Sequence, residues 1–174
     1  MISSAFDLGE QLALKTIEYK LHQDLWGVYN LSAVNLDFAT WTKIKYLNAA
    51  GTGLHANVDT VPNNSGGLYL FYLECPVITG LTEYPFYVGR AQFTAGQNLR
   101  KRVKEYYQHY VLNNERPKIT KMLKYWGNEL HLAYKTLPNN AATIDFEKKL
   151  INTLLLPMND QIPDQEIRQA VQAF

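Results

Sequence analysis

The stretch that decides the fold is residues 67–89, which read GLYLFYLECPVITGLTEYPFYVG. It contains two short runs rich in aromatic and β-branched residues, and Pro76, Gly80 and Pro85 interrupt the chain between and beside them. Apolar runs bounded by Gly and Pro are typical of strands. The stretch therefore predicts the two strands of a hairpin joined by a long loop.

The first of these runs is apolar on both of its faces, because side chains alternate along a strand. One face carries Tyr69, Phe71 and Leu73, and the other carries Leu68, Leu70 and Tyr72. A strand that is apolar on both sides is expected in the middle of a sheet, with other elements covering each face.

Downstream of the hairpin, apolar residues recur at helical spacing in several segments. They predict helices over 99–112, 117–126 and 141–156, with a strand over 129–135 where the apolar residues alternate instead. A short helix is expected in the tail, residues 161–174.

Residues 1–65 are predicted to form an N-terminal helical arm. Apolar residues at near-helical spacing predict a helix from Asp7, as its N-cap, to Leu25, and Gly27 marks its end. A second short helix is expected over 36–47, followed by a long loop rich in Gly, Pro and Asn.

Together these elements predict an α+β fold around a small central antiparallel sheet of three strands, flanked by helices in the order β-β-α-α-β-α. The chain of 174 residues is expected to form one domain with an added arm. We place the arm at 1–65, the main domain at 66–160 and the tail helix at 161–174.

The composition, 47% hydrophobic and 19% charged, is that of an ordinary globular protein. No apolar run reaches the roughly 20 residues of a membrane span, and the N-terminus lacks the pattern of a signal peptide. The one cysteine, Cys75, excludes an internal disulfide and a multi-cysteine zinc site. We therefore expect a cytoplasmic protein without a membrane partner.

The charge is unevenly distributed, although the net charge is only +1. The segment from Arg90 to Lys124 holds nine Lys and Arg residues and two Glu residues, whereas acidic residues predominate in the rest of the chain. A solvated basic helix face is one interpretation of such a segment. A surface that binds phosphates is the other.

Glu147 lies within the apolar stripe of the predicted helix 141–156, three residues before Leu150 and four before Ile151. A buried carboxylate without a partner is costly, so Glu147 is expected to be protonated, paired with a cation or bound to a metal. The simpler alternative is a side chain at the edge of the stripe that reaches solvent or a lysine. A carboxylate that holds a hard divalent cation is one way to engage phosphates.

Tyr69 and Tyr87 each belong to a predicted strand that also carries a glycine. In a chain with 12 tyrosines, aromatic residues of the sheet core are the simpler interpretation. Gly89, however, removes a side chain where a ligand or another backbone can approach closely. A phenol titrates near pH 10, so as a general base it needs a cation nearby, such as Arg90 or Arg102.

Arg102 flanks the packed stripe of the predicted helix 99–112 and offers a permanently charged, bidentate partner for a phosphate oxygen. Its neighbours Arg100, Lys101 and Lys104 cannot all face the same way, so at most part of this run belongs to one site. The four histidines have no partner at metal-ligand spacing and are interpreted as surface or packing residues.

Two of these features form a pair of tripeptides, Gly67-Leu68-Tyr69 and Tyr87-Val88-Gly89. Their sequence and separation resemble the two tripeptides for which the GIY-YIG nuclease superfamily is named. Leu68 and Val88 replace isoleucine in them, and both replacements are conservative.

Residues further along the chain extend the resemblance over about 66–160. Arg102, with Tyr106 four residues later, is similar to the family's arginine followed by a His or Tyr. Glu147 is similar to the single acidic metal ligand, and Asn159 to the asparagine of the C-terminal loop.

The resemblance implies a catalytic set of Tyr69, Tyr87, Arg102, Tyr106 and Glu147, in which Glu147 holds one Mg²⁺ or Mn²⁺ ion. In the family, the ion engages the scissile phosphate, an activated water attacks in line, and the arginine neutralises the developing charge. Tyr69 and Tyr106 both remain candidates for the general base. The supporting, phosphate-binding set is Gly89, Arg90, Lys101, Lys104 and Asn159.

The implied function is that of a divalent-metal-dependent endonuclease acting on double-stranded DNA, without an organic cofactor. A compact chain without a separate recognition module looks most like a restriction-type enzyme, and cutting both strands favours a homodimer. The alternatives are a structure-specific repair, recombination or mobile-element nuclease and a non-catalytic nucleic-acid-binding module. The recognition sequence, the preference for DNA or RNA, the oligomeric state and the pathway cannot be predicted.

Overall fold

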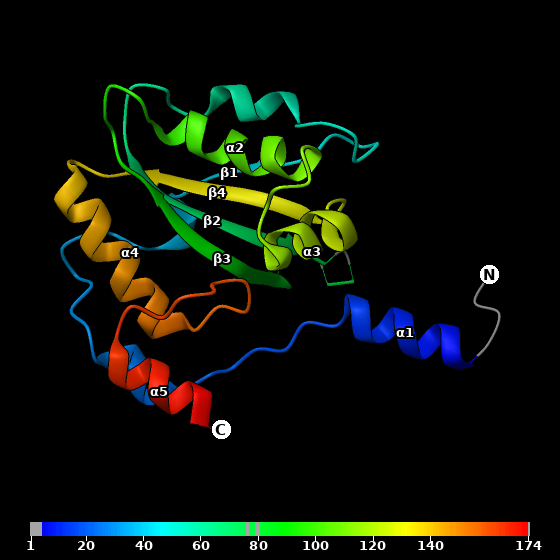
Figure 1. Ribbon diagram of the computed structural model, residues 1–174. Helices are drawn as coiled ribbons and strands as arrows, with labels where there is room; N and C mark the ends of the chain where they lie inside the picture. Colours follow the sequence, from blue (N-terminus) through cyan, green and yellow to red (C-terminus); the bar gives the residue numbers. More distant parts are fainter. Residues whose placement is uncertain (1–4, 76, 79–80, 174) are drawn as a thin grey trace.

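The computed structural model describes residues 5–75, 77–78 and 81–173, and this part of the chain forms an α+β fold (Figure 1). The fold class is therefore confirmed. The strands are β1 (Thr42–Lys45), β2 (Gly67–Glu74), β3 (Glu83–Ala91) and β4 (Leu130–Thr136). The α-helices are α1 (Ala5–Lys15), α2 (Leu99–Val111), α3 (Pro117–Trp126), α4 (Asn140–Leu154) and α5 (Gln165–Ala173). Short 3₁₀ helices occupy Gln23–Gly27, Phe38–Thr40 and Ala56–Thr60.

The sheet is antiparallel with the order β1-β4-β2-β3, so the prediction of three strands is wrong. The fourth strand, β1, comes from the segment 36–47 that was predicted to be a helix. Phe38, Trp41, Ile44 and Leu47 recur every three residues, which imitates a helical stripe. Hydrogen bonding along β4 overrides that local signal and draws the chain into the sheet.

The predicted hairpin is β2 and β3, and β2 lies between β3 and β4 as its two apolar faces predict. Pro85 does not end a strand but lies inside β3, opposite Tyr72, where the pairing register shifts. Since β3 is an edge strand, a proline there removes no ladder hydrogen bond in the middle of the sheet. Pro76 and Gly80, the other predicted interruptions, lie outside the described residues.

Helices cover both faces of the sheet (Figure 1). Tyr69 and Phe71 pack on one face with α2 and α3, whereas Leu68 and Tyr72 pack on the other face with α4. The predicted helices 99–112, 117–126 and 141–156 correspond to α2, α3 and α4, and the tail contains the expected short helix, α5. The segment between α4 and α5 turns back onto the sheet, where the amide of Met158 donates to the carbonyl of Phe86 at 3.0 Å.

The N-terminal helix is shorter than predicted, because α1 ends at Lys15 and not at Leu25. The residues that follow leave the helix so that Ile17 and Tyr19 pack against the core. The role of Asp7 as N-cap lies outside the described side chains. Segments within residues 1–65 also join the folded body, since Tyr46 and Val61 are fully buried. Among the described helices, none is long and apolar enough to cross a membrane.

Candidate active site

Three tyrosines from separate elements meet in one hydrogen-bonded cluster. The hydroxyl of Tyr69 on β2 lies 2.7 Å from that of Tyr106 on α2, and Tyr106 donates to the hydroxyl of Tyr87 on β3 at 3.1 Å. All three side chains are buried, with 1% of Tyr69, 6% of Tyr87 and 2% of Tyr106 exposed. The hairpin thus brings the two tripeptide tyrosines together, and α2 supplies the third.

Gly89 makes this cluster sterically possible. It lies directly opposite Tyr69 in the β2–β3 ladder, and a Cβ atom built on it would be 2.5 Å from the Tyr69 hydroxyl oxygen and 2.6 Å from its Cζ. The sequence predicted a close approach at Gly89 by a ligand or backbone. In the structure, the group that uses the space is the ring of Tyr69.

Gly89→Ala is therefore expected to destabilise the protein by about 1–3 kcal/mol, the usual cost of overpacking a core. Chemical denaturation of the wild type and of Gly89→Ala measures the change in free energy of unfolding. Gly96→Ala is the matched control, since a Cβ there meets nothing within 4 Å. An unchanged stability for Gly89→Ala would show that the Tyr69 ring can move aside and that the cluster is not fixed.

Arg102 is held against the tyrosine cluster by its own helix. Its Nη2 donates to the Tyr106 hydroxyl at 3.4 Å, and its Nη1 donates to Glu105 at 3.1 Å. Gln97 in turn donates to the Glu105 carboxylate at 3.0 Å, which fixes that carboxylate in place. Burial, and next the neighbouring phenol of Tyr87, raise the pKa of Tyr69, against the opposing charge of Arg102.

Burial also raises the pKa of Tyr106 well above its usual value. Tyr69 and Tyr106 are therefore protonated at neutral pH, so that their hydroxyls act as hydrogen-bond donors as well as acceptors. Tyr87 lies at the edge of the cluster, where its hydroxyl accepts from both Tyr106 and an arginine.

That arginine is Arg116, which is not among the predicted site residues. Its Nη2 lies 3.5 Å from the Tyr87 hydroxyl, and its guanidinium carbon lies 5.5 Å from the centre of the Tyr87 ring. The buried carboxylate of Glu115 anchors it at 3.4 Å from Nε. The one sequence signal for Arg116 was its place in the basic segment, because it belongs to neither tripeptide nor to the Arg102 motif.

Glu147 forms an ion pair with Arg90, so its predicted need for a cationic partner is met by an arginine. Its side chain is 14% exposed. Burial raises the pKa of the Glu147 carboxyl, while the charges of Arg90 and Arg102 act in the opposite direction. Glu147 and Tyr87 also line one common cavity, which relates this carboxylate to the edge of the tyrosine cluster.

Of these groups, Tyr87, Arg90, Arg116 and Glu147 line one polar cavity of about 700 Å³, whereas Tyr69, Arg102 and Tyr106 are not among its lining residues. Tyr87 lines it from β3, Arg116 from the start of α3, and Glu147 from α4. The remaining lining comes from β3, α4, the loop after α4 and α5, and consists of Arg90, Lys148, Ile151, Asn159, Asp160, Gln161, Ile162, Pro163 and Arg168. Four cations and two carboxylates thus surround one cavity, which suits an anionic ligand that also carries or recruits a cation.

The side chain of Asn159, which lines the cavity, is hydrogen-bonded to the backbone of β3. Its side-chain oxygen accepts from the Val88 amide at 3.1 Å, and its side-chain nitrogen donates to the Val88 carbonyl at 2.8 Å. Both hydrogen-bonding groups of one residue of the edge strand β3 are therefore satisfied by a single side chain. This holds the second tripeptide against the loop that follows α4.

Lys101 and Lys104, which were expected to support phosphate binding, lie outside this cavity. Lys101 donates to the carbonyl of Gly96, and Lys104 pairs with Asp59. The structure thus brings together Tyr69, Tyr87, Gly89, Arg90, Arg102, Tyr106, Glu147 and Asn159, but places the two lysines elsewhere on the surface.

The expected divalent cation can be tested against the donors present. Glu147 contacts Arg90 through one carboxylate oxygen, Oε2, and lines the polar cavity, an arrangement that fits an ion which keeps most of its waters. Within the described residues, no group of three or more His, Cys, Asp or Glu side chains could form an all-protein cage.

In the comparisons with known proteins, no family model matches this chain, and neither a curated protein nor a solved structure matches it. Its function is therefore inferred from the geometry of the site and from the sequence motifs.

Proposed function

We propose that the chain is a divalent-metal-dependent endonuclease that hydrolyses phosphodiester bonds of double-stranded DNA, with a site similar to that of GIY-YIG nucleases. One observation carries the proposal. The tyrosines of both tripeptides, Arg102 and Tyr106 form one hydrogen-bonded cluster, and Tyr87, at the edge of that cluster, lines the same polar cavity as Glu147.

In this proposal Glu147 holds one Mg²⁺ or Mn²⁺ ion. When bound, the ion supplies a Lewis acid for the phosphoryl oxygen and for the leaving oxygen. Burial raises the pKa of the Glu147 carboxyl, and Arg90, as its ion-pair partner, opposes that rise and favours the ionised form. Asn159 holds β3, the strand that carries Tyr87, against the loop that follows α4.

The arginines stabilise charge on the phosphate, and the tyrosines position the nucleophile. Arg102 is fixed by Glu105 and Tyr106, so its guanidinium needs little reorganisation when negative charge develops. Tyr87 is the phenol that lines the cavity and accepts from Tyr106 and Arg116, so we assign it the contact with the attacking water. Tyr69 and Tyr106, which have raised pKa values, orient Tyr87 from behind.

Within this class, we propose a restriction-type enzyme that acts as a homodimer. In this proposal the compact body that forms the cavity also reads the DNA sequence. The arm offers a surface for a second copy, because Leu12 and Leu14 on α1 are 57% and 48% exposed. A structure-specific nuclease and a non-catalytic nucleic-acid-binding module are distinguished from it by the products formed.

Binding to duplex DNA in EDTA is expected to weaken steeply as salt increases. If the cavity cations Arg90, Arg116 and Lys148, together with Arg102, contact phosphates, the logarithm of the binding constant should fall with a slope of about −3 or steeper against the logarithm of salt concentration. Fluorescence anisotropy of a labelled duplex at several salt concentrations measures the slope. A binding constant that does not change with salt would show that the basic segment is a solvated surface and that DNA is not the substrate.

A further inference from the structure

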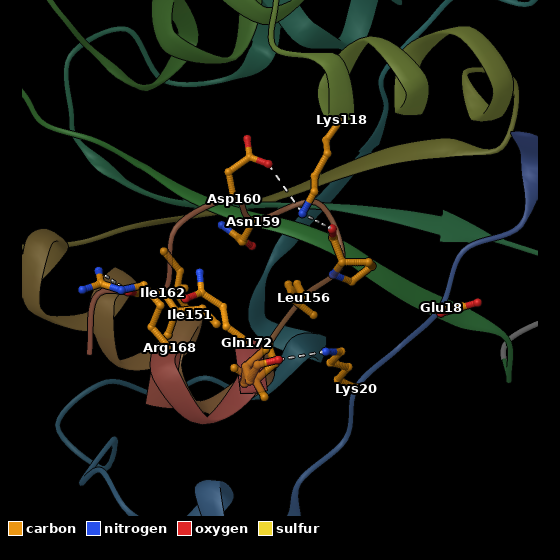
Figure 2. A pocket seen from close by; sticks show the side chains of 13 residues that line it. Glu18, Lys20, Lys118, Ile151, Leu156, Asn159, Asp160, Ile162, Arg168 and Gln172 are labelled. Atoms are coloured by element: carbon orange, nitrogen blue, oxygen red, sulfur yellow. Dashed lines mark hydrogen bonds and ion pairs between the residues drawn. The ribbon is translucent and has the colours of Figure 1, made fainter. Parts of the chain in front are cut away.

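A second group of charges lies next to the candidate cleavage centre, where the loop after α4 meets the start of α3. Asp160 lies between two cations, with its Oδ2 3.6 Å from Arg116 Nη1 and its Oδ1 3.5 Å from Lys118 Nζ. Figure 2 shows a second pocket, next to the cavity of Glu147, in which the side chains of Lys118 and Asp160 point toward each other.

Contacts other than Asp160 hold the two cations in place. Lys118 Nζ donates to the carbonyl of Pro157 at 3.1 Å. Arg116 is held by the buried Glu115 at 3.4 Å and by the Tyr87 hydroxyl at 3.5 Å. Both side chains would therefore keep their positions if the Asp160 carboxylate moved away.

Asp160 itself is held more weakly. Its side chain is 34% exposed, and its separations from both cations are longer than those of a short charge-assisted hydrogen bond. Ion pairs of this kind between exposed side chains contribute little, so another anion can replace the carboxylate at small cost.

The position that Asp160 fills can be reached from two sides. Asp160, Asn159, Ile162 and Arg168 line both the cavity of Glu147 and a neighbouring cavity of about 320 Å³, which Figure 2 shows. A polyanion that occupies the first cavity and continues into the second would pass between Arg116 and Lys118. The Asp160 carboxylate lies where a negative charge of that polyanion would lie.

We propose that Arg116 and Lys118 form a second phosphate subsite, which Asp160 fills in the free protein and a backbone phosphate of the DNA takes over on binding. The inference rests on the proposed function, because it assigns the phosphate next to the scissile one to this position. Asp160 then acts as an internal competitor that lowers the affinity for DNA. A free or terminal phosphate has the same chemistry, so the experiment must separate these two sources.

The test measures affinity for a labelled duplex in EDTA by fluorescence anisotropy. Asp160→Asn is expected to bind roughly two- to fivefold more tightly than the wild type, the range given by losing one exposed ion-pair competitor. Glu83→Gln is the matched control, since Glu83 pairs with Lys43 at 3.0 Å, is 32% exposed and lies outside both cavities. It changes the net charge equally but should leave affinity within about twofold.

Lys118→Gln completes a double-mutant cycle. It should weaken binding and reduce the steepness of the salt dependence by about one unit, and it should abolish most of the gain from Asp160→Asn. Additive effects would show that Asp160 acts only through long-range repulsion, and would overturn the subsite. An unchanged or lower affinity for Asp160→Asn would overturn it as well.

Further outcomes distinguish the source of the phosphate and separate the failure of the subsite from the failure of the proposed function. If inorganic phosphate competes with the duplex in Asp160→Asn more than sodium chloride of equal ionic strength does, the subsite belongs to a free or terminal phosphate and the backbone assignment is overturned. Coupling between Asp160 and Lys118 without Mg²⁺-dependent cleavage by the wild type would overturn the nuclease but support the subsite. Cleavage without coupling would overturn the subsite alone, and an absence of DNA binding would overturn both.

Discussion

Glu147→Gln is expected to lower the rate of Mg²⁺-dependent DNA cleavage by about a thousandfold or more, because a metal ion contributes several kcal/mol to the stabilisation of a phosphoryl transition state. Glutamine has the same shape but no negative charge to hold the ion. The substitution also removes the carboxylate partner of Arg90. Single-turnover cleavage of a defined duplex, with Mg²⁺ and with Mn²⁺, measures the effect.

Two controls separate the loss of the metal ligand from a loss of DNA binding and from a general effect of charge. DNA binding by Glu147→Gln in EDTA should be equal to or stronger than that of the wild type, since the substitution frees Arg90 and removes a negative charge from the cavity. Glu83→Gln, which removes a half-exposed carboxylate outside the cavity, should cleave at the wild-type rate. Cleavage retained by a folded Glu147→Gln protein would remove Glu147 from the mechanism.

Arg102→Gln is expected to reduce cleavage by about 10²–10³-fold, the loss usually found when one preorganised donor to transition-state charge is removed. Its guanidinium is fixed by Glu105 and Tyr106, and its charge also acts on Glu147. Because its role is tied to the transition state, the loss should appear in the rate of single-turnover cleavage more than in DNA affinity.

The matched control is Lys43→Gln, which removes one positive charge at the Lys43–Glu83 pair, outside the polar cavity, and should change the rate little. The stability of Arg102→Gln must be measured as well, because Arg102 also contacts the buried Tyr106. A folded Arg102→Gln protein that cuts DNA at the wild-type rate would show that the cluster of tyrosines and arginine has a structural role only.

Much of the fold could be predicted because its signals are local. The hairpin strands, α2, α3 and β4 each carry an apolar pattern of their own, bounded by Gly, Pro or Asn. One exception is β1, whose residues repeat at a near-helical interval while their hydrogen-bond partner, β4, lies more than 80 residues away in the sequence. A contact so distant along the chain leaves no trace in the local pattern.

The site was predictable to the extent that each residue belongs to a motif. Tyr69, Tyr87, Arg102 and Tyr106 meet because the hairpin and α2 are adjacent elements, and Gly89 leaves room for the Tyr69 ring. Arg116 was missed because its relation to Tyr87 depends on how α3 packs, which no spacing in the sequence encodes. The reverse holds for Lys101 and Lys104, whose charge suggested phosphate binding although their side chains lie elsewhere.

The most direct test of a metal-dependent endonuclease at this site is incubation of the purified protein with plasmid and phage DNA, in parallel with Mg²⁺ and with EDTA. We predict discrete fragments with Mg²⁺ and none with EDTA, and mapping their ends would give the recognition site. Nicks or a smear would indicate a structure-specific nuclease instead of a restriction-type enzyme. No cleavage of DNA with Mg²⁺ or Mn²⁺ would contradict the proposed activity and favour a binding module.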